Sequence, residues 1–181
     1  MFARQTTARQ LRERAAAFYD TLVVQARNPT FYQAFGVADT VDGRFDLIVL
    51  HAVLLFNRLL GEGEAGRVLQ QAVFDYFFAD MDRSLREMGT SDLAVPRRVK
   101  VMAQSFYGRM GAYQPAIAAG DRALLAHAIE RNLFPGMVRA NESGALADYA
   151  LATAAALSGQ PVGSVPLTYP DPIAWVQETR R

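Results

Sequence analysis

The chain has 181 residues, of which 51% are hydrophobic, and it carries a net charge of +1 and no cysteine. This length suits one domain that buries a sizeable core without crosslinks, and the missing cysteines exclude disulfides, thiol nucleophiles and thiolate-bound metals. The near-neutral charge argues against nucleic acid as a partner, because phosphate binding normally needs a basic surplus or a strong basic stripe.

The N-terminal part of the chain is expected to be helical. Apolar residues repeat at helical spacing from Ala8 to Ala26, and Asn28-Pro29 ends this helix, because a residue before proline is pushed out of the helical region. Its arginines, without an apolar signal core, indicate an exposed helix of a cytoplasmic protein. A short helix is predicted over residues 30–35, and Thr40 or Asp42 is expected to cap the next one.

The helix from about Arg44 to Leu60 is apolar around most of its circumference, which places it near the middle of a helical bundle. Its longest apolar run, Leu47–Phe56, is shorter than the ~20 residues that a membrane span requires. His51 interrupts this run. We interpret it as a core imidazole with a hydrogen-bond partner rather than as a metal ligand or a base.

The stretch Phe74–Tyr113 predicts two helices that return along each other. Gly89 suits the left-handed cap that ends the first helix, and Pro96 opens the second, where its missing N–H costs nothing. Helical spacing turns Phe106, Met110 and Tyr113 inward. The arginines of the second helix are expected on the outside: Arg97, Arg98 and Arg109.

Gly108 and Gly111 interrupt the second of these helices, where each glycine costs about 1 kcal/mol relative to alanine. Two explanations stay open. Either another helix packs closely against the glycines, or a bent, exposed helix end presents Tyr107, Arg109 and Tyr113 to a partner, since tyrosine and arginine are favoured at binding hot spots.

Further helices are expected over Arg122–Leu133 and Ser143–Leu157, and four prolines after Ser158 predict an extended tail anchored by Ile173 and Trp175. No alternating period-two run occurs. The predicted fold is therefore all-α: a single-domain bundle of about six to eight helices over residues 1–160, with an extended Pro-rich C-terminal tail over residues 161–181.

No established catalytic or metal-binding motif is present, and we expect no enzyme activity, cofactor or metal. One alternative stays open, in which Asp75 and Asp82 hold Mg²⁺ in a helical enzyme or binding protein for an apolar or isoprenoid ligand. A solvated charged surface is the preferred interpretation, because Arg83 and Arg86 are close enough to pair with the aspartates and no second acidic helix faces them.

Several stretches resemble the ubiquinol–cytochrome c chaperone family, assembly factors for ubiquinol–cytochrome c reductase. The likeness covers about residues 31 to 113, fades toward residue 157, and is weakened at the turn Thr90-Ser91, where the family carries a Val-Gly-like pair. The matching pieces are Val37–Asp46, Leu50-His51, Phe74–Gly89, Asp92–Val95 and Phe106–Arg109.

The resemblance implies a non-enzymatic chaperone that holds newly made cytochrome b, or binds an assembly partner, until haem insertion and complex assembly proceed. It also implies a bacterial member in the cytoplasm or at the inner face of the plasma membrane, with peripheral membrane association. The candidate partner-binding residues are the polar positions inside the matching pieces: Asp80, Asp82, Arg83, Arg86, Arg109 and Tyr113.

Three classes of protein are thus distinguished by surface shape. A closed cavity ringed by acidic residues favours the enzyme, and a shallow apolar groove bordered by charge favours the chaperone, which must expose more apolar surface than an ordinary monomer. An apolar patch covered by a second copy of the chain favours an oligomeric scaffold.

Overall fold

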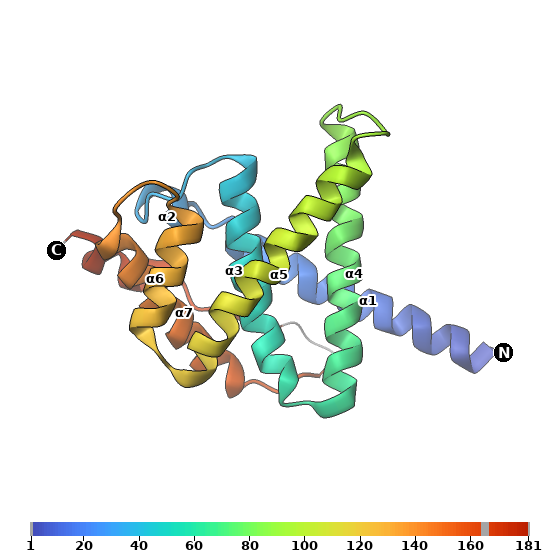
Figure 1. The fold of residues 1–181 in the computed structure, drawn as a ribbon. Coiled ribbons are helices and arrows are strands. Elements are labelled where there is room, and N and C mark those ends of the chain that lie inside the picture. Colours follow the sequence, from blue (N-terminus) through green and yellow to red (C-terminus); the bar gives the residue numbers. More distant parts are fainter. Residues whose placement is uncertain (1, 164–166, 181) are drawn as a thin grey trace.

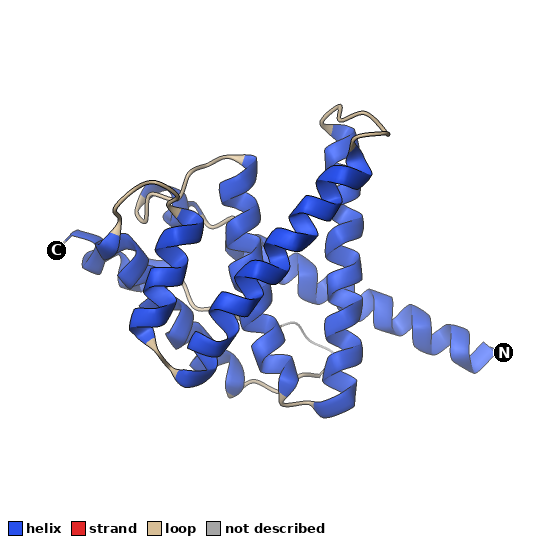
Figure 2. Cartoon of the chain, in the orientation of Figure 1, coloured by secondary structure: helices blue, strands red, loops and turns tan. Residues whose placement is uncertain are grey.

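The computed structural model describes residues 2–163 and 167–180, with side chains described over residues 8–163 and 167–176. Within these ranges all regular secondary structure is helical and no strand occurs, which confirms the all-α bundle predicted from sequence (Figures 1 and 2). The helices are α1 (Phe2–Ala26), α2 (Pro29–Gln33), α3 (Val41–Leu60), α4 (Gly63–Glu87), α5 (Val95–Ala119), α6 (Arg122–Leu133), α7 (Ala140–Ser158) and a 3₁₀ helix, η1 (Pro172–Arg180).

Helix α3 is the centre of the bundle, as its apolar sequence predicts. Most of its 20 residues are buried, and it packs against α1, α4, α5, α6 and α7. Figure 1 shows α3 between α4 on one side and the pair α6 and α7 on the other, with α5 crossing it from the far end of α4 toward α6. Both parts of the molecule therefore share one core.

The entry into α3 is fixed by short-range contacts within residues 37–46. The Thr40 side chain accepts a hydrogen bond from the Gly43 N–H at 3.2 Å, which confirms Thr40 as the cap of this helix. Gly43 has no room for a side chain, because a Cβ there would collide with the backbone oxygen of Ala38. Asp39 and Arg44 form an ion pair at 2.6 Å across the same turn.

The hairpin of α4 and α5 projects from the body, with its turn at the far end (Figure 1). Gly89 adopts a left-handed conformation with φ of 82°, as its predicted capping role requires. Helix α5 then runs on to Ala119 with Pro115 inside it, whereas the sequence suggested a separate short helix or turn after Tyr113. Continuing the helix buries the apolar side chains of Ala116 and Ile117, which stabilises it.

The prediction of an extended tail is wrong for its last part, which forms η1. Pro172 is the first residue of η1, a position where a proline loses no helical hydrogen bond. Trp175 packs against Tyr149 with ring centroids 5.5 Å apart, but Ile173 is exposed, and Val176 fills the anchoring role instead. A division of the chain near residue 160 stays a prediction.

His51 connects three helices through a buried chain of hydrogen bonds. Its Nδ1 donates to the Leu47 carbonyl at 2.7 Å, and the Tyr149 hydroxyl donates to Nε2 at 2.9 Å. Gln25 donates to the same hydroxyl and also to the carbonyl of Pro170, which ties the tail to α1. Burial lowers the pKa of His51 to about 4, so the ring is a neutral core imidazole, as predicted.

The glycines of the bundle offer a matched test of packing. We expect Gly43→Ala to lower the free energy of unfolding by roughly 1–3 kcal/mol, because the new methyl meets backbone that must move. In Gly108→Ala the new methyl group enters open space beside a helix, so the free energy of unfolding should rise by roughly 0.5–1 kcal/mol. Urea unfolding measures both values, and equal effects of the two substitutions would contradict this account of Gly43.

Stability should depend on pH through His51. Its pKa is about 4 in the folded protein and about 6.5 in an unfolded chain. As pH falls through this interval the unfolded chain binds the proton first, so His51 lowers the free energy of unfolding by roughly 3 kcal/mol. His51→Gln should remove this pH-dependent contribution, so the wild-type protein should lose more stability than the variant as pH falls from about 6.5 to about 4. Urea unfolding at several pH values measures this, and a constant stability difference between the two proteins would contradict the role of His51.

Candidate functional site

An open groove lies where the first turns of α3, the last turns of α4 and the first half of α5 meet. It has a volume of about 720 Å³. Three exposed aliphatic side chains border it, Val41, Met88 and Val101, with exposed fractions of 55%, 58% and 54%. The other side chains that line it include Phe45, Leu85 and Met102 on the apolar side and Asp46, Arg97, Arg98 and Arg109 on the charged side.

A largely buried ion pair forms the polar part of the groove. Asp46 of α3 and Arg109 of α5 have side chains only 7% and 18% exposed, and Arg109 Nη2 lies 2.7 Å from Asp46 Oδ1. Arg109 also lies over the Phe45 ring at 5.7 Å and donates to the Ser105 carbonyl. Burial raises the pKa of Asp46 to about 6, although the charge of Arg109 opposes this rise.

Two candidate partner-binding residues, Arg109 and Tyr113, are more buried than a surface role predicts. Arg109, expected on the outside of its helix, turns inward because Asp46 offers it a buried carboxylate. Tyr113 is fully buried, in agreement with its helical spacing but not with a role in presenting a surface to a partner. Burial and the Asp46 carboxylate raise the pKa of its hydroxyl. Charge reversal at Arg109, a natural test of a surface residue, would instead place two carboxylates together in the core.

The other four candidates lie on α4, outside the groove. Asp80 accepts a hydrogen bond from the Tyr19 hydroxyl at 2.9 Å and pairs with Arg83, so it fastens α4 to α1. Arg86 pairs with both Asp82 and Asp92, which closes the hairpin turn. The structure therefore brings these residues into intramolecular pairs, and only Arg109 of the original six lines the groove. Their role in partner binding stays a prediction.

Sequence reasoning missed the groove residues Val41, Phe45 and Asp46. A signal was available, because Asp46 and Arg109 end two of the stretches that carry the family resemblance. Spacing along one helix does not reveal a partner that far away in the chain.

Neither explanation that the sequence offered for Gly108 and Gly111 is fully met by the structure. A Cβ at Gly108 or Gly111 would meet nothing within 4 Å, so no other helix of the described chain packs closely there. Of the three side chains that a helix end was to present, only Tyr107 is exposed. This face of α5 is open.

The two aspartates of the metal alternative are both engaged by neighbouring polar side chains. Asp75 accepts a hydrogen bond from Gln71 at 2.7 Å, while Asp82 is held by Arg86. In the described part of the chain, no three His, Cys, Asp or Glu side chains gather where they could hold a metal ion. The groove has apolar walls with arginines at its border, and Asp42 and Asp46 are the acidic residues in its lining.

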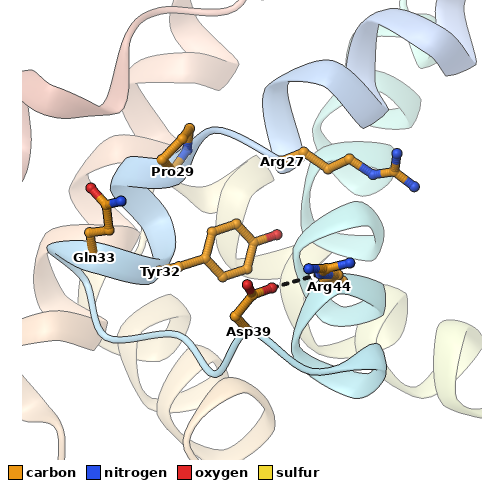
Figure 3. Close-up of a pocket in the computed structure, with 6 residues that line it drawn as sticks. All are labelled: Arg27, Pro29, Tyr32, Gln33, Asp39 and Arg44. Carbon is orange, nitrogen blue, oxygen red and sulfur yellow. Dashed lines mark hydrogen bonds and ion pairs between the residues drawn. The ribbon is translucent and has the colours of Figure 1, made fainter.

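A second hollow lies beside the loop before α3 and has a volume of about 530 Å³ (Figure 3). Its acid and one of its arginines, Asp39 and Arg44, pair with each other, and the Tyr32 hydroxyl donates to the Ala26 carbonyl. The Arg27 side chain points away from this pair (Figure 3). We interpret this hollow as the junction between α2 and α3.

Among the described residues, no helix is both long enough and apolar enough to cross a membrane.

Comparison with known proteins gives a consistent result. A sequence model described as ubiquinol-cytochrome C chaperone matches residues 33–165. The chain is 25% identical over 119 residues to a ubiquinol-cytochrome-c reductase complex assembly factor 1 of Xenopus laevis, and 26% identical over 138 residues to that of Drosophila melanogaster. These matches cover 66% and 74% of this chain and 59% and 52% of the relatives, so the chain spans about half the length of the curated relatives it matches.

A solved structure is similar over nearly the whole chain. The crystal structure of the Cbp3 homolog from Brucella abortus superposes with a TM-score of 0.83 and 34% sequence identity, covering 96% of this chain and 98% of that one. The likeness thus includes the hairpin and the central helix that form the groove.

The ion pair predicts a specific pattern of stability. Arg109→Met leaves the Asp46 carboxylate buried without its partner, which should cost roughly 3–5 kcal/mol near neutral pH. The loss should shrink near pH 5.5, because the unpaired carboxyl protonates at a higher pH than it does beside Arg109. The double variant Asp46→Asn with Arg109→Met should recover most of the loss in urea unfolding. Additive losses would contradict the pairing.

Proposed function

Because the chain belongs to the ubiquinol-cytochrome C chaperone family, we propose that it is an assembly chaperone of ubiquinol–cytochrome c reductase. In this proposal it holds newly made cytochrome b, or binds an assembly partner, until the complex forms. The family match over residues 33–165 and the likeness to a Cbp3 homolog support the family part of this proposal. The relatives with 25% and 26% identity carry the name of reductase complex assembly factors, which supports the process.

The observation that carries the proposal is the open apolar groove on α3, α4 and α5. Aliphatic side chains such as Val41, Met88 and Val101 stay more than half exposed around a hollow of about 720 Å³. Exposed apolar surface that is gathered in one concave place, with a charged border, is typical of a site for another protein. An unfinished membrane subunit offers the apolar segments that such a groove would cover.

The enzyme alternative lacks a comparable observation. Asp75 and Asp82 are engaged by neighbouring side chains on the surface of α4, and neither lines the groove. We therefore propose a non-enzymatic role in which the protein contributes binding surface alone.

The proposal also includes the place of work. A client that is a membrane subunit is made at the membrane, so we propose that this chaperone acts in the cytoplasm at the inner face of the plasma membrane, associated with it peripherally.

Deleting the gene should lower the amounts of spectroscopically detected cytochrome b and of assembled reductase in native membranes. The wild-type gene should restore both. A variant with Met88→Asp and Val101→Asp should not, because it places charge on the apolar border of the groove. The control carries Val24→Asp and Val138→Asp at two exposed aliphatic positions outside the groove, 74% and 91% exposed, and should restore assembly.

Cytochrome b and assembled reductase at parental levels in the deletion strain would end the proposal. Full rescue by the Met88→Asp and Val101→Asp variant would leave the assembly role standing but show that the groove is not needed for it.

A further inference from the structure

Positively charged side chains gather where α5 begins, at the border of the groove. This helix contains no Asp or Glu, and Arg97, Arg98 and Lys100 stand in its first two turns. The free N–H groups of a helix start already carry positive partial charge, so cations are unfavourable there in the isolated protein. A favourable interaction with something outside the chain would offset this cost.

These cations are not neutralised within the described part of the chain. Arg98 donates to the Thr90 hydroxyl at 3.2 Å, and neither Arg97 nor Lys100 has an ion pair. Two carboxylates of the hairpin, Asp82 and Asp92, are both taken by Arg86. The lining of the groove also includes the Asp42 carboxylate, so its border carries a net positive charge, not positive charge alone, beside exposed aliphatic side chains.

The polar floor gives an independent reason to expect a partner. The Asp46 side chain is more than nine-tenths buried and its Oδ1 is paired with Arg109, whereas Nε of Arg109 has no hydrogen-bond partner. Buried polar atoms in folded proteins are nearly always hydrogen-bonded. A guanidinium N–H that lacks a hydrogen bond at the bottom of an apolar groove suits an acceptor supplied from outside, such as a carboxylate.

We propose that the groove binds an apolar helical segment that bears carboxylates. Its apolar side chains lie against Met88 and Val101, and its carboxylates pair with Arg97 and Arg98. A guanidinium accepts a carboxylate through two parallel hydrogen bonds, which fixes orientation as well as charge. The inference rests on the proposed function and names the chemistry by which the client, or the assembly partner, is recognised.

The shape of the site favours a protein segment over other occupants. Grooves that take one face of an amphipathic helix are a common mode of recognition, and about 720 Å³ leaves room for part of one such face. An anionic bilayer would meet projecting residues first, whereas Phe45 and Met102 lie inside the hollow. Binding to lipid, or to a second copy of the chain, is therefore an outcome that the test must separate.

The test uses the full chain and two fluorescent peptides of about 18 residues, long enough for roughly five helical turns. Both are helix-forming Leu/Ala sequences, one ending in Asp-Asp and the other in Asn-Asn. Fluorescence anisotropy should show roughly tenfold tighter binding of the Asp-Asp peptide, with the difference lost at high salt. Arg97→Gln with Arg98→Gln should abolish the difference, whereas Arg12→Gln with Arg131→Gln, on α1 and α6, should keep it.

The apolar part of the inference has its own variant. Val101→Ser should weaken both peptides, and Val138→Ser, on a distant loop, should weaken neither. Equal binding of the two peptides by the wild-type protein overturns the inference. So does preferential binding to phosphatidylglycerol vesicles through Arg97 and Arg98, or a concentration-dependent dimer that the same substitutions dissociate.

The same arginine variant separates this inference from the proposed function in cells. If gene deletion lowers assembled reductase but the Arg97→Gln and Arg98→Gln protein restores it fully, the assembly role stands and carboxylate recognition fails. If deletion has no effect, the assembly role fails whatever the peptides do.

Discussion

The ion pair between Asp46 and Arg109 is the contact on which the shape of the groove depends. It joins the start of α3 to the middle of α5, and both side chains are largely removed from water at a separation of 2.7 Å. Burying two charges is costly, and an apolar pair of similar size is often as stable. We therefore infer that the pair is retained for geometry: it fixes how far α5 stands from α3.

The hairpin is held from the opposite side by α1. The Tyr19 hydroxyl donates to Asp80, and the Tyr19 ring packs against Tyr76 and Phe77 with centroids 5.3 and 5.7 Å apart. Burial and the nearby carboxylate raise the pKa of Tyr19, which keeps its hydroxyl protonated and able to donate. α4 is thereby fastened on its outer side while α5 is fastened through Arg109 on its inner side.

Helical periodicity predicted most of this architecture, because it depends only on neighbours in sequence. The central position of α3, the Gly89 cap and the core role of His51 all follow from local patterns. The position of Arg109 did not follow. It shares a helix face with the buried residues Phe106 and Tyr113, but its charge alone predicted exposure to solvent. Its burial depends on one carboxylate contributed by another helix. The tail failed for a related reason, since proline density excludes an α-helix but permits a 3₁₀ helix that begins at Pro172.

An apolar groove in water tends to close, so its persistence needs a cause. Closing it would move α5 toward the start of α3, which would compress the Asp46–Arg109 contact and press Arg97 and Arg98 against the apolar side chains of Val41 and Phe45. Desolvating two unpaired guanidinium groups costs more than the aliphatic contacts would return. In the proposed binding mode, the arginines that pair with the carboxylates of the partner also oppose closure of the groove in its absence.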